Sequence, residues 1–241
     1  MRKFLHLNPE LDLTAFRARF ASEGRVQIQD VLTPRSALEI QSILAESTPW
    51  GLAWQAGLDG PHLIRSEEFQ KLTSFERSAI LAKLETVDGE SYAFLYHSYP
   101  LVTAYLERWN PGSPHEGLLE ELNSPAFLNL LRQVSGENDI IKVDGQATLY
   151  APGNFLWPHD DEETARGRKV AYVLNMTRGD WRPQWGGYLN FFDQDWNVAH
   201  AIRPLFNSLN LFAVPLWHSV SEVTAAAPVG RFAITGWARD Q

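Results

Sequence analysis

Two histidines and one aspartate have the residue types and the order of a transition-metal site. One residue separates His159 from Asp161, and His218 follows far downstream, directly after Trp217. Two histidines and a carboxylate can hold a non-haem Fe(II) by three protein ligands, which leaves three coordination positions open. If residues 159–161 are extended, the side chains of His159 and Asp161 point to the same face and one metal can bridge them. Asp160 then points to the other face, so we do not expect it to be a ligand.

Short apolar segments around these residues predict the strands that must position them. Gly, Pro, Asn and Asp separate the segments, which is typical of an all-β sandwich or barrel. His218 lies just past one segment, and Arg231 opens the last. In a closed β structure, residues distant in sequence converge at the same mouth. The expected strands are residues 169–175, 186–192, 209–214 and 232–237.

The first half of the chain has mainly helical patterns. Helical spacing or capping signals predict helices over residues 11–21, from Thr33-Pro34 onward, over residues 75–84, and from Ser124-Pro125 to a stop at Gly136. Residues 25–31 alternate like a strand. Residues 50–70 and 88–114 are rich in Gly, Pro, Tyr and Trp, so we expect irregular structure there. No repeat or linker composition divides the chain, which predicts one domain.

The composition limits the classes of function. The chain has 241 residues, of which 44% are hydrophobic, so it can bury a full core. No apolar run approaches the ~18–20 residues needed to cross a bilayer, and the N-terminus has no apolar core of a secretory signal. The chain has no cysteine, which excludes disulfides and thiol catalysis but leaves the compartment open, so cytoplasm is the default expectation. A net charge of −8 argues against a broad nucleic-acid-binding surface.

Other residues that could bind metal or substrate have weaker patterns. The remaining histidines show no ligand spacing with one another, and we expect surface or loop positions for His6, His62, His97, His115 and His200. Arg166, Arg168 and Lys169 gather before the strand that follows the metal motif. A solvated strand end is the preferred interpretation of this basic group, and a substrate-binding patch is the alternative.

From about residue 147 to 240, the chain resembles the prolyl hydroxylase branch of the Fe(II)/2-oxoglutarate-dependent oxygenases. The matching segments are Tyr150-Ala151-Pro152-Gly153-Asn154, His159-Asp160-Asp161, Tyr172-Val173-Leu174-Asn175, Trp185-Gly186-Gly187-Tyr188-Leu189, Trp217-His218 and Arg231-Phe232-Ala233-Ile234-Thr235-Gly236-Trp237. Their order and spacing fit the family's double-stranded β-helix, or jelly-roll, core. The resemblance therefore implies a mainly β fold with flanking helices. Residues 1–140 or so would form helical support and the substrate entrance, and residues 141–241 the catalytic core.

The resemblance also implies an iron site and an anchor for the cosubstrate. His159, Asp161 and His218 would bind Fe(II), and Arg231 would form a salt bridge with the distal carboxylate of 2-oxoglutarate. Arginine suits this role because its planar, permanently charged guanidinium matches a carboxylate with two hydrogen bonds.

Further positions are implied for the cosubstrate pocket, with one departure from the family. Tyr150 lies where the family often places a tyrosine hydroxyl near the cosubstrate, and Thr235 and Trp237 lie on the strand behind the pocket. Some prolyl hydroxylases have a second tyrosine at the position occupied here by Val173. One hydrogen bond to the cosubstrate is therefore expected to be missing.

The activity implied is hydroxylation of an unactivated C–H bond, with O₂ as oxidant, succinate and CO₂ as co-products, and ascorbate as an accessory reductant. The resemblance favours a prolyl residue in a protein or peptide as substrate. We expect the segment from Tyr92 to Trp109, which includes Tyr96 and Tyr99, to form an aromatic wall for an extended peptide. One alternative is a hydroxylase of a free amino acid or small metabolite. Outside this class, the jelly roll also builds non-catalytic binding modules.

Overall fold

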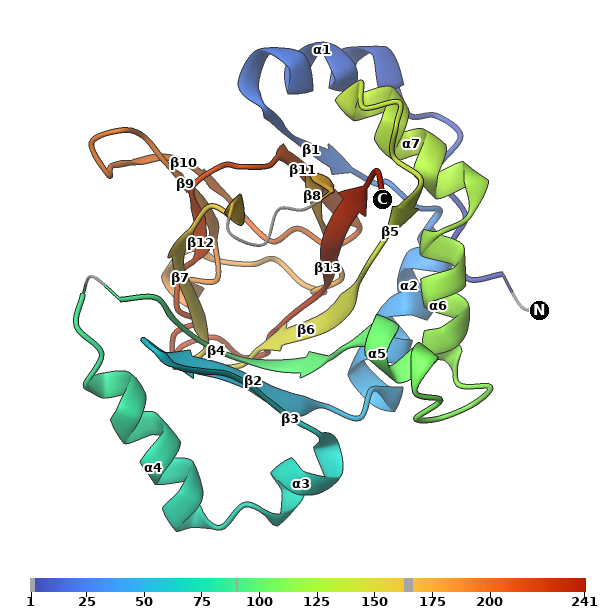
Figure 1. Cartoon of the computed structure of the whole chain (residues 1–241). Coiled ribbons are helices and arrows are strands. Elements are labelled where there is room, and N and C mark those ends of the chain that lie inside the picture. Colours follow the sequence, from blue (N-terminus) through green and yellow to red (C-terminus); the bar gives the residue numbers. More distant parts are fainter. Residues whose placement is uncertain (1–2, 90, 163–166) are drawn as a thin grey trace.

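An antiparallel sheet curls into a nearly closed barrel in the computed structural model, which describes residues 3–89, 91–162 and 167–241 (Figure 1). Within these residues the hydrogen-bonded strand order is β1-β11-β8-β13-β6-β4-β7-β12-β9-β10. Outside this path, β2 pairs with both β4 and β3, and β5 pairs with β13. The strands are β1 (Arg25–Gln29), β2 (Gly51–Ala56), β3 (Asp59–Ile64), β4 (Ala93–Tyr99), β5 (Lys142–Val143), β6 (Gln146–Tyr150), β7 (Phe155–His159), β8 (Arg168–Asn175), β9 (Leu189–Phe192), β10 (Val198–Ile202), β11 (Ser208–Ala213), β12 (His218–Val220) and β13 (Arg231–Arg239). The expected mainly β, jelly-roll architecture is confirmed.

Helices from the first half of the chain cover one side of the barrel, and α3 and α4 lie beyond the β2–β3 hairpin (Figure 1). The helices are α1 (Leu13–Glu23), α2 (Pro34–Ser42) with a π-helical turn (Ile43–Ser47), α3 (Ser66–Lys71), α4 (Ser74–Glu85), α5 (Leu101–Leu106), α6 (Pro114–Leu122), α7 (Pro125–Ser135) and a 3-10 turn (Pro183–Trp185). In the part of the chain that is described, no helix combines the length and apolarity needed to span a membrane.

The predicted strands and helices largely form, but two segments expected to be irregular do not. Residues 50–70 contain β2 and β3, and residues 88–114 contain β4 and α5. Gly57 has φ +60 and lies at the β2–β3 turn. Pairing explains the difference, because β2 hydrogen-bonds to β3 on one edge and to β4 on the other. Tertiary pairing therefore outweighs the weak β propensity of Gly51, Ala53 and Gln55.

Strand β8 shows how the sheet separates two cores. Its side chains alternate, so Val170, Tyr172 and Leu174 join the apolar cluster under the helices, whereas Ala171 and Val173 face the barrel interior. Both faces are buried, which explains why the sequence of this strand is a nearly continuous apolar run. The helical layer thus covers the outer face of the same strands whose inner face lines the barrel.

Strand register brings the predicted site residues together. β12 pairs with β7 so that His218 lies opposite His159. β13 pairs with β6 so that Arg231 lies opposite Tyr150. Strand β4 from the first half of the chain pairs with both β6 and β7, and so joins the two sides of the barrel. The first half therefore supplies strands of the barrel as well as helices.

His115 is buried, which contradicts its predicted surface position. Only 3% of the residue is exposed, and its Nε2 lies 2.9 Å from Thr48 Oγ1 inside the helical layer. Burial lowers the pKa of His115 to about 4. Isolated histidines carry no sequence signal that distinguishes such a core position from a solvent-exposed one.

The His115 environment predicts acid sensitivity of the fold. Above pH 6.5 the imidazole of His115 is neutral in both the folded and the unfolded chain. Between pH 6.5 and about 4, the unfolded chain binds a proton at this imidazole and the folded chain does not. Lowering the pH from 7 to 5 should therefore cost roughly 2 kcal/mol of unfolding free energy at this site. Urea unfolding of wild type and His115→Gln at both pH values tests this. An equal loss in both proteins would contradict it.

Candidate metal centre and cosubstrate pocket

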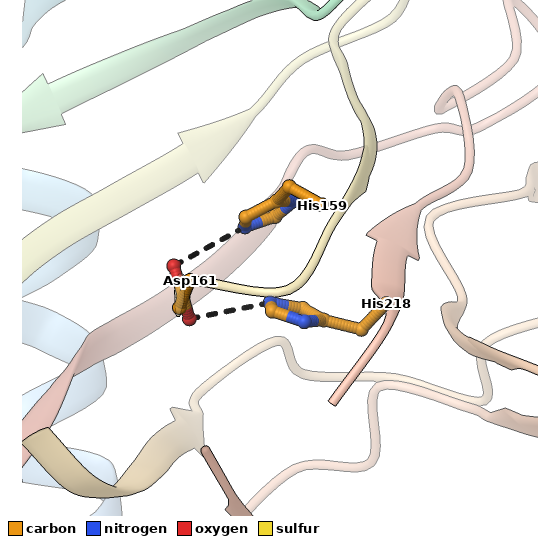
Figure 2. Close-up of side chains that lie close together, drawn as sticks. All are labelled: His159, Asp161 and His218. Carbon is orange, nitrogen blue, oxygen red and sulfur yellow. Dashed lines mark ion pairs between the residues drawn. The ribbon is translucent and has the colours of Figure 1, made fainter. Parts of the chain in front are cut away.

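His159 ends strand β7 with its ring held by the backbone. Its Nδ1 lies 3.0 Å from the backbone oxygen of Trp157. A carbonyl oxygen only accepts hydrogen bonds, so Nδ1 must carry a proton, and in this tautomer of the imidazole Nε2 has the lone pair. That nitrogen faces Asp161, with Nε2 to Oδ1 at 3.6 Å (Figure 2).

His218 is the first residue of strand β12, which pairs with β7, and a backbone oxygen also holds its ring. Its Nδ1 lies 2.7 Å from the backbone oxygen of Leu216, and its Nε2 lies 3.8 Å from Asp161 Oδ2. Burial, and secondarily the neighbouring His159, lower the pKa of His218 to about 4. The nitrogen that faces Asp161 is therefore unprotonated at neutral pH and can donate its lone pair to a cation.

Asp161 reaches the histidines from a turn, contrary to the predicted extended geometry. Strand β7 ends at His159, and Asp161 has φ +66, in the left-handed region. Strand alternation therefore does not explain why the two side chains converge. Only 7% of the Asp161 side chain is exposed. The carboxylate is thus directed into the barrel mouth by the bend of the chain after His159.

The three side chains fit a divalent transition metal. One ligand atom from each of His159, Asp161 and His218 lies within 4.8 Å of the other two. The distances from Asp161 to both imidazoles exceed those of a good direct hydrogen bond, so these atoms surround a common point. Two neutral imidazole nitrogens and one carboxylate oxygen form the donor set of a facial-triad Fe(II) site.

A cavity of about 130 Å³ adjoins the three ligands inside the barrel. Aromatic and aliphatic side chains form most of its wall, with a few polar groups among them. The lining residues include Tyr92, Tyr96, Gln146, Thr148, Tyr150, Leu156, His159, Asp161, Val173, Phe212, His218, Arg231, Thr235 and Trp237. All seven residues predicted for the site therefore line one cavity.

Arg231 places a buried positive charge in this cavity. The residue is 1% exposed, and in the described part of the chain its Nε has no hydrogen-bond partner. Burial lowers the pKa of Arg231, but a guanidinium stays charged even so. Its Cζ lies 5.2 Å from the centre of the Tyr150 ring, which in turn stacks on Tyr96. A buried guanidinium of this kind fits an anionic ligand such as the carboxylate of 2-oxoglutarate.

The other predicted cosubstrate residues occupy different parts of the wall. Thr235 lies on β13, paired with Gln146 on β6 and with Val173 on β8. Val173 presents an aliphatic side chain to the cavity, so it supplies no hydroxyl there. Trp237 instead donates its indole N–H to Asp161 Oδ2 at 2.9 Å. Its observed contact is thus with the proposed metal ligand.

Arg168 belongs to the site, although the sequence favoured a solvated strand end. Its side chain is 12% exposed, its Cζ lies 3.5 Å from the Trp237 ring centre, and its Nη1 lies 3.8 Å from Asp161 Oδ1. Arg166, from the same basic group, lies outside the described residues. No periodicity or motif distinguished Arg168 from neighbouring charges, because its partners come from distant segments. Tyr99, in contrast, is buried near Trp109 in the helical core, away from the cavity.

Two glycines shape the wall behind Arg231. A Cβ atom on Gly186 (φ +66) would overlap the backbone oxygen of Glu222. A Cβ atom on Gly187 would lie 3.2 Å from Trp181 Cζ2 and 3.4 Å from Arg231 Cδ. Because Gly186 and Gly187 have no side chains, the backbone of Glu222 can lie close to Gly186, and the side chains of Trp181 and Arg231 can lie close to Gly187.

Gly186→Ala is expected to destabilise the fold by at least about 2 kcal/mol, because it adds a steric overlap to an unfavourable backbone conformation. Gly24→Ala is the control, since Gly24 has the same φ of +66 but nothing within 4 Å of an added Cβ. Urea unfolding should show a loss of only about 1 kcal/mol for the control. Equal losses in the two variants would contradict the steric argument.

The barrel has the jelly-roll architecture, and the arrangement of His159, Asp161 and His218 fits a metal site. The chain is similar in structure to a Pseudomonas putida prolyl-4-hydroxylase (TM-score 0.57, 20% identity, covering 95% of this chain and 99% of that one). A Trichoplax adhaerens prolyl hydroxylase, solved with a peptide of the hypoxia inducible factor oxygen degradation domain, has TM-score 0.50, 17% identity, and coverage of 95% and 89%. The epimerase SnoN, in complex with Fe³⁺, alpha ketoglutarate and nogalamycin RO, has TM-score 0.55, 12% identity, and coverage of 95% and 83%. No curated protein matches the sequence.

Residues 145–239 match the model of the 2OG-Fe(II) oxygenase superfamily. This segment of the chain is therefore similar to the 2OG-Fe(II) oxygenases, and the fold of the chain is like that of the prolyl hydroxylase structures. Enzymes of this superfamily use Fe(II), 2-oxoglutarate and O₂, and the two-histidine, one-aspartate group lies within the matched segment.

Proposed function

We propose that this enzyme hydroxylates a prolyl residue of a protein or peptide, with His159, Asp161 and His218 as the Fe(II) ligands. The observation that carries the proposal is one cavity that contains both the three converging ligands and the buried guanidinium of Arg231. The fold shared with two prolyl hydroxylases, one solved with a bound peptide, supports the choice of substrate class.

In this mechanism the protein holds and orients the reactants. The backbone oxygens of Trp157 and Leu216 fix the two imidazoles with Nε2 toward the metal position. Arg231 would bind the distal carboxylate of 2-oxoglutarate, in the cavity that Tyr150 and Thr235 also line. When bound, Fe(II) would allow O₂ to oxidise both 2-oxoglutarate, which gives succinate and CO₂, and the substrate C–H bond, with one oxygen atom going to succinate and the other to the hydroxyl group. Leu156 and Phe212 form apolar parts of the wall and exclude water.

The binding proposal is tested by adding Fe(II) and 2-oxoglutarate to the protein without oxygen. A weak charge-transfer band should appear in the visible spectrum, disappear in His159→Ala and weaken in Arg231→Ala. His200→Ala is the matched control, because His200 lies on β10 and does not line the cavity. Folded, iron-loaded wild type without the band would refute the cosubstrate site.

The substrate class is tested with prolyl peptides, free proline and other small metabolites, with and without ascorbate. Substrate-dependent succinate formation and addition of one oxygen atom to a peptide would support the prolyl proposal. Turnover of only a small molecule would replace it with the small-molecule alternative. Iron and 2-oxoglutarate binding without turnover of any of them would leave the prolyl assignment unsupported.

An exposed aromatic pair beside the metal site fits a peptide substrate. Trp196 and Trp217 are 58% and 42% exposed, their ring centres lie 4.8 Å apart, and Trp217 directly precedes His218. Trp196 keeps φ +63, an unfavourable conformation for a non-glycine residue. Exposed tryptophans of this kind bind proline-rich segments by stacking.

Trp196→Ala should raise KM for a prolyl peptide by about 5- to 10-fold, equivalent to roughly 1 kcal/mol of lost contact. The charge-transfer band of the Fe(II)–2-oxoglutarate complex should stay unchanged, because Trp196 does not line the cavity. Steady-state kinetics with the best peptide measures the effect. Phe75→Ala is the control, since Phe75 is 82% exposed but lies on α4. An unchanged KM in Trp196→Ala would refute a role for this pair.

A further inference from the structure

The three proposed metal ligands are not fixed in the same way. His159 and His218 lie on paired strands, and each ring is tied to a backbone oxygen. Asp161 lies beyond the end of β7, with φ +66, so no strand ladder fixes its direction. Its carboxylate must be held by side chains from other elements if the metal geometry is to be preformed.

Trp237 on β13 provides such a contact. Its indole Nε1 donates a hydrogen bond to Asp161 Oδ2 at 2.9 Å. A hydrogen bond from a neutral donor to an ionised carboxylate is among the stronger types, and it fixes the direction of the group. With Oδ2 bound in this way, Oδ1 lies 3.6 Å from His159 Nε2.

Trp237 is itself held firmly at both backbone and ring. Its backbone N–H donates to Asp144 Oδ1 at 2.8 Å, and the backbone N–H of Asp144 donates to the Trp237 oxygen at 3.1 Å. Arg239 Nε binds the other oxygen of Asp144 at 2.7 Å. Arg168 covers the indole ring, with Cζ 3.5 Å from the ring centre. The donor therefore has little freedom to follow a displaced carboxylate.

We propose that Trp237 is a positioning residue for the metal site, which directs one oxygen of Asp161 to the iron and keeps the other hydrogen-bonded. A carboxylate that binds through one oxygen leaves three coordination positions for cosubstrate and O₂. This inference rests on the proposed role of Asp161 as a metal ligand. It differs from the expectation that Trp237 contacts the cosubstrate.

The test compares wild type, Trp237→Phe and a matched control in three measurements. These are Fe(II) affinity of the metal-free protein, the visible spectrum of the Co(II)-substituted protein, and 2-oxoglutarate affinity at saturating Fe(II). The control is Trp54→Phe, because Trp54 is buried outside the barrel and its indole nitrogen has no hydrogen-bond partner among the described residues. Both variants lose the same atoms, but only Trp237→Phe loses the bond to Asp161.

Trp237→Phe should weaken Fe(II) binding by about 10- to 100-fold, the usual effect of losing a group that orients a metal ligand. Its Co(II) spectrum should change, its 2-oxoglutarate affinity at saturating iron should stay within about twofold, and Trp54→Phe should match wild type. If Trp237→Phe does not fold, Trp237→Leu, which also has no side-chain donor, should give the same pattern.

Three results separate this inference from the proposed function. Unchanged or tighter Fe(II) binding in Trp237→Phe would overturn the positioning role. Weaker 2-oxoglutarate binding with unchanged Fe(II) binding would overturn it too, and would assign Trp237 to the cosubstrate. Failure of wild type itself to bind Fe(II) would refute the proposed function, and with it the role of Asp161 on which the inference depends.

Discussion

An Arg231→Met variant should bind 2-oxoglutarate about 100-fold more weakly than wild type, while its Fe(II) affinity is retained. Removing one partner of a buried, hydrogen-bonded charge pair costs roughly 2–5 kcal/mol, and 100-fold corresponds to about 3 kcal/mol. The guanidinium of Arg231 is 1% exposed and faces the cavity beside the metal ligands, so solvent cannot replace it. Titration of the iron-loaded variant with 2-oxoglutarate, followed by the charge-transfer band, measures the loss.

The same substitution should stabilise the ligand-free protein by about 1–4 kcal/mol, because a buried charge is replaced by an apolar side chain of similar volume. Urea unfolding without cosubstrate measures this gain, which distinguishes a lost binding group from a damaged fold. Arg203→Met is the control, since Arg203 is on the surface near Asp180 and does not line the cavity. Wild-type affinity for 2-oxoglutarate in Arg231→Met would contradict the assigned role.

His218→Ala should weaken Fe(II) binding by more than about 100-fold and reduce 2-oxoglutarate turnover to background. Loss of a group that merely orients a metal ligand costs about 10- to 100-fold, and loss of the ligand itself must cost more. Burial and the neighbouring His159 keep His218 unprotonated, and its Nδ1 is already used by the backbone oxygen of Leu216. Anaerobic calorimetry with Fe(II), together with succinate formation, gives both quantities.

Thermal unfolding supplies a second measure of the His218→Ala effect. A metal that binds only the folded state raises Tm, so excess Fe(II) should stabilise wild type but not the variant. His200→Ala should respond to Fe(II) as wild type does, because His200 lies on β10 and lines a different surface. Iron-dependent stabilisation of His218→Ala equal to that of wild type would exclude His218 as a ligand.

Four strands of the second half, β8, β9, β11 and β13, could be predicted because their patterns are local. The apolar run of β8 and the turn residues between strands both reflect burial and backbone geometry that act within a few residues. Strands β2 and β4 could not be predicted in the same way. Their segments contain Gly, Ser, His and Gln as well as apolar residues, and their conformation depends on pairing with strands elsewhere in the chain.

The chemistry of the site could be proposed from residue types, but its geometry could not. The order His159, Asp161, His218 and Arg231 pointed to metal and carboxylate binding, and the fold brings all four to one cavity. The reason given for the convergence of His159 and Asp161 was wrong, because a left-handed residue rather than an extended strand turns Asp161 inward. The buried position of Arg168 beside Trp237 also had no sequence signal.

The sequence by itself determined which groups could bind a metal and an anionic cosubstrate, since those properties belong to the side chains of two histidines, an aspartate and an arginine. It also determined five of the thirteen described strands, namely β1, β8, β9, β11 and β13, through local apolar patterns. Only the tertiary structure decided how these groups are arranged: which indole hydrogen-bonds to the carboxylate of Asp161, and which guanidinium is buried in the cavity. The contact of the indole with Asp161 joins residues 76 apart, and the Arg239–Asp144 contact that supports the indole joins residues 95 apart, so no local pattern encodes them.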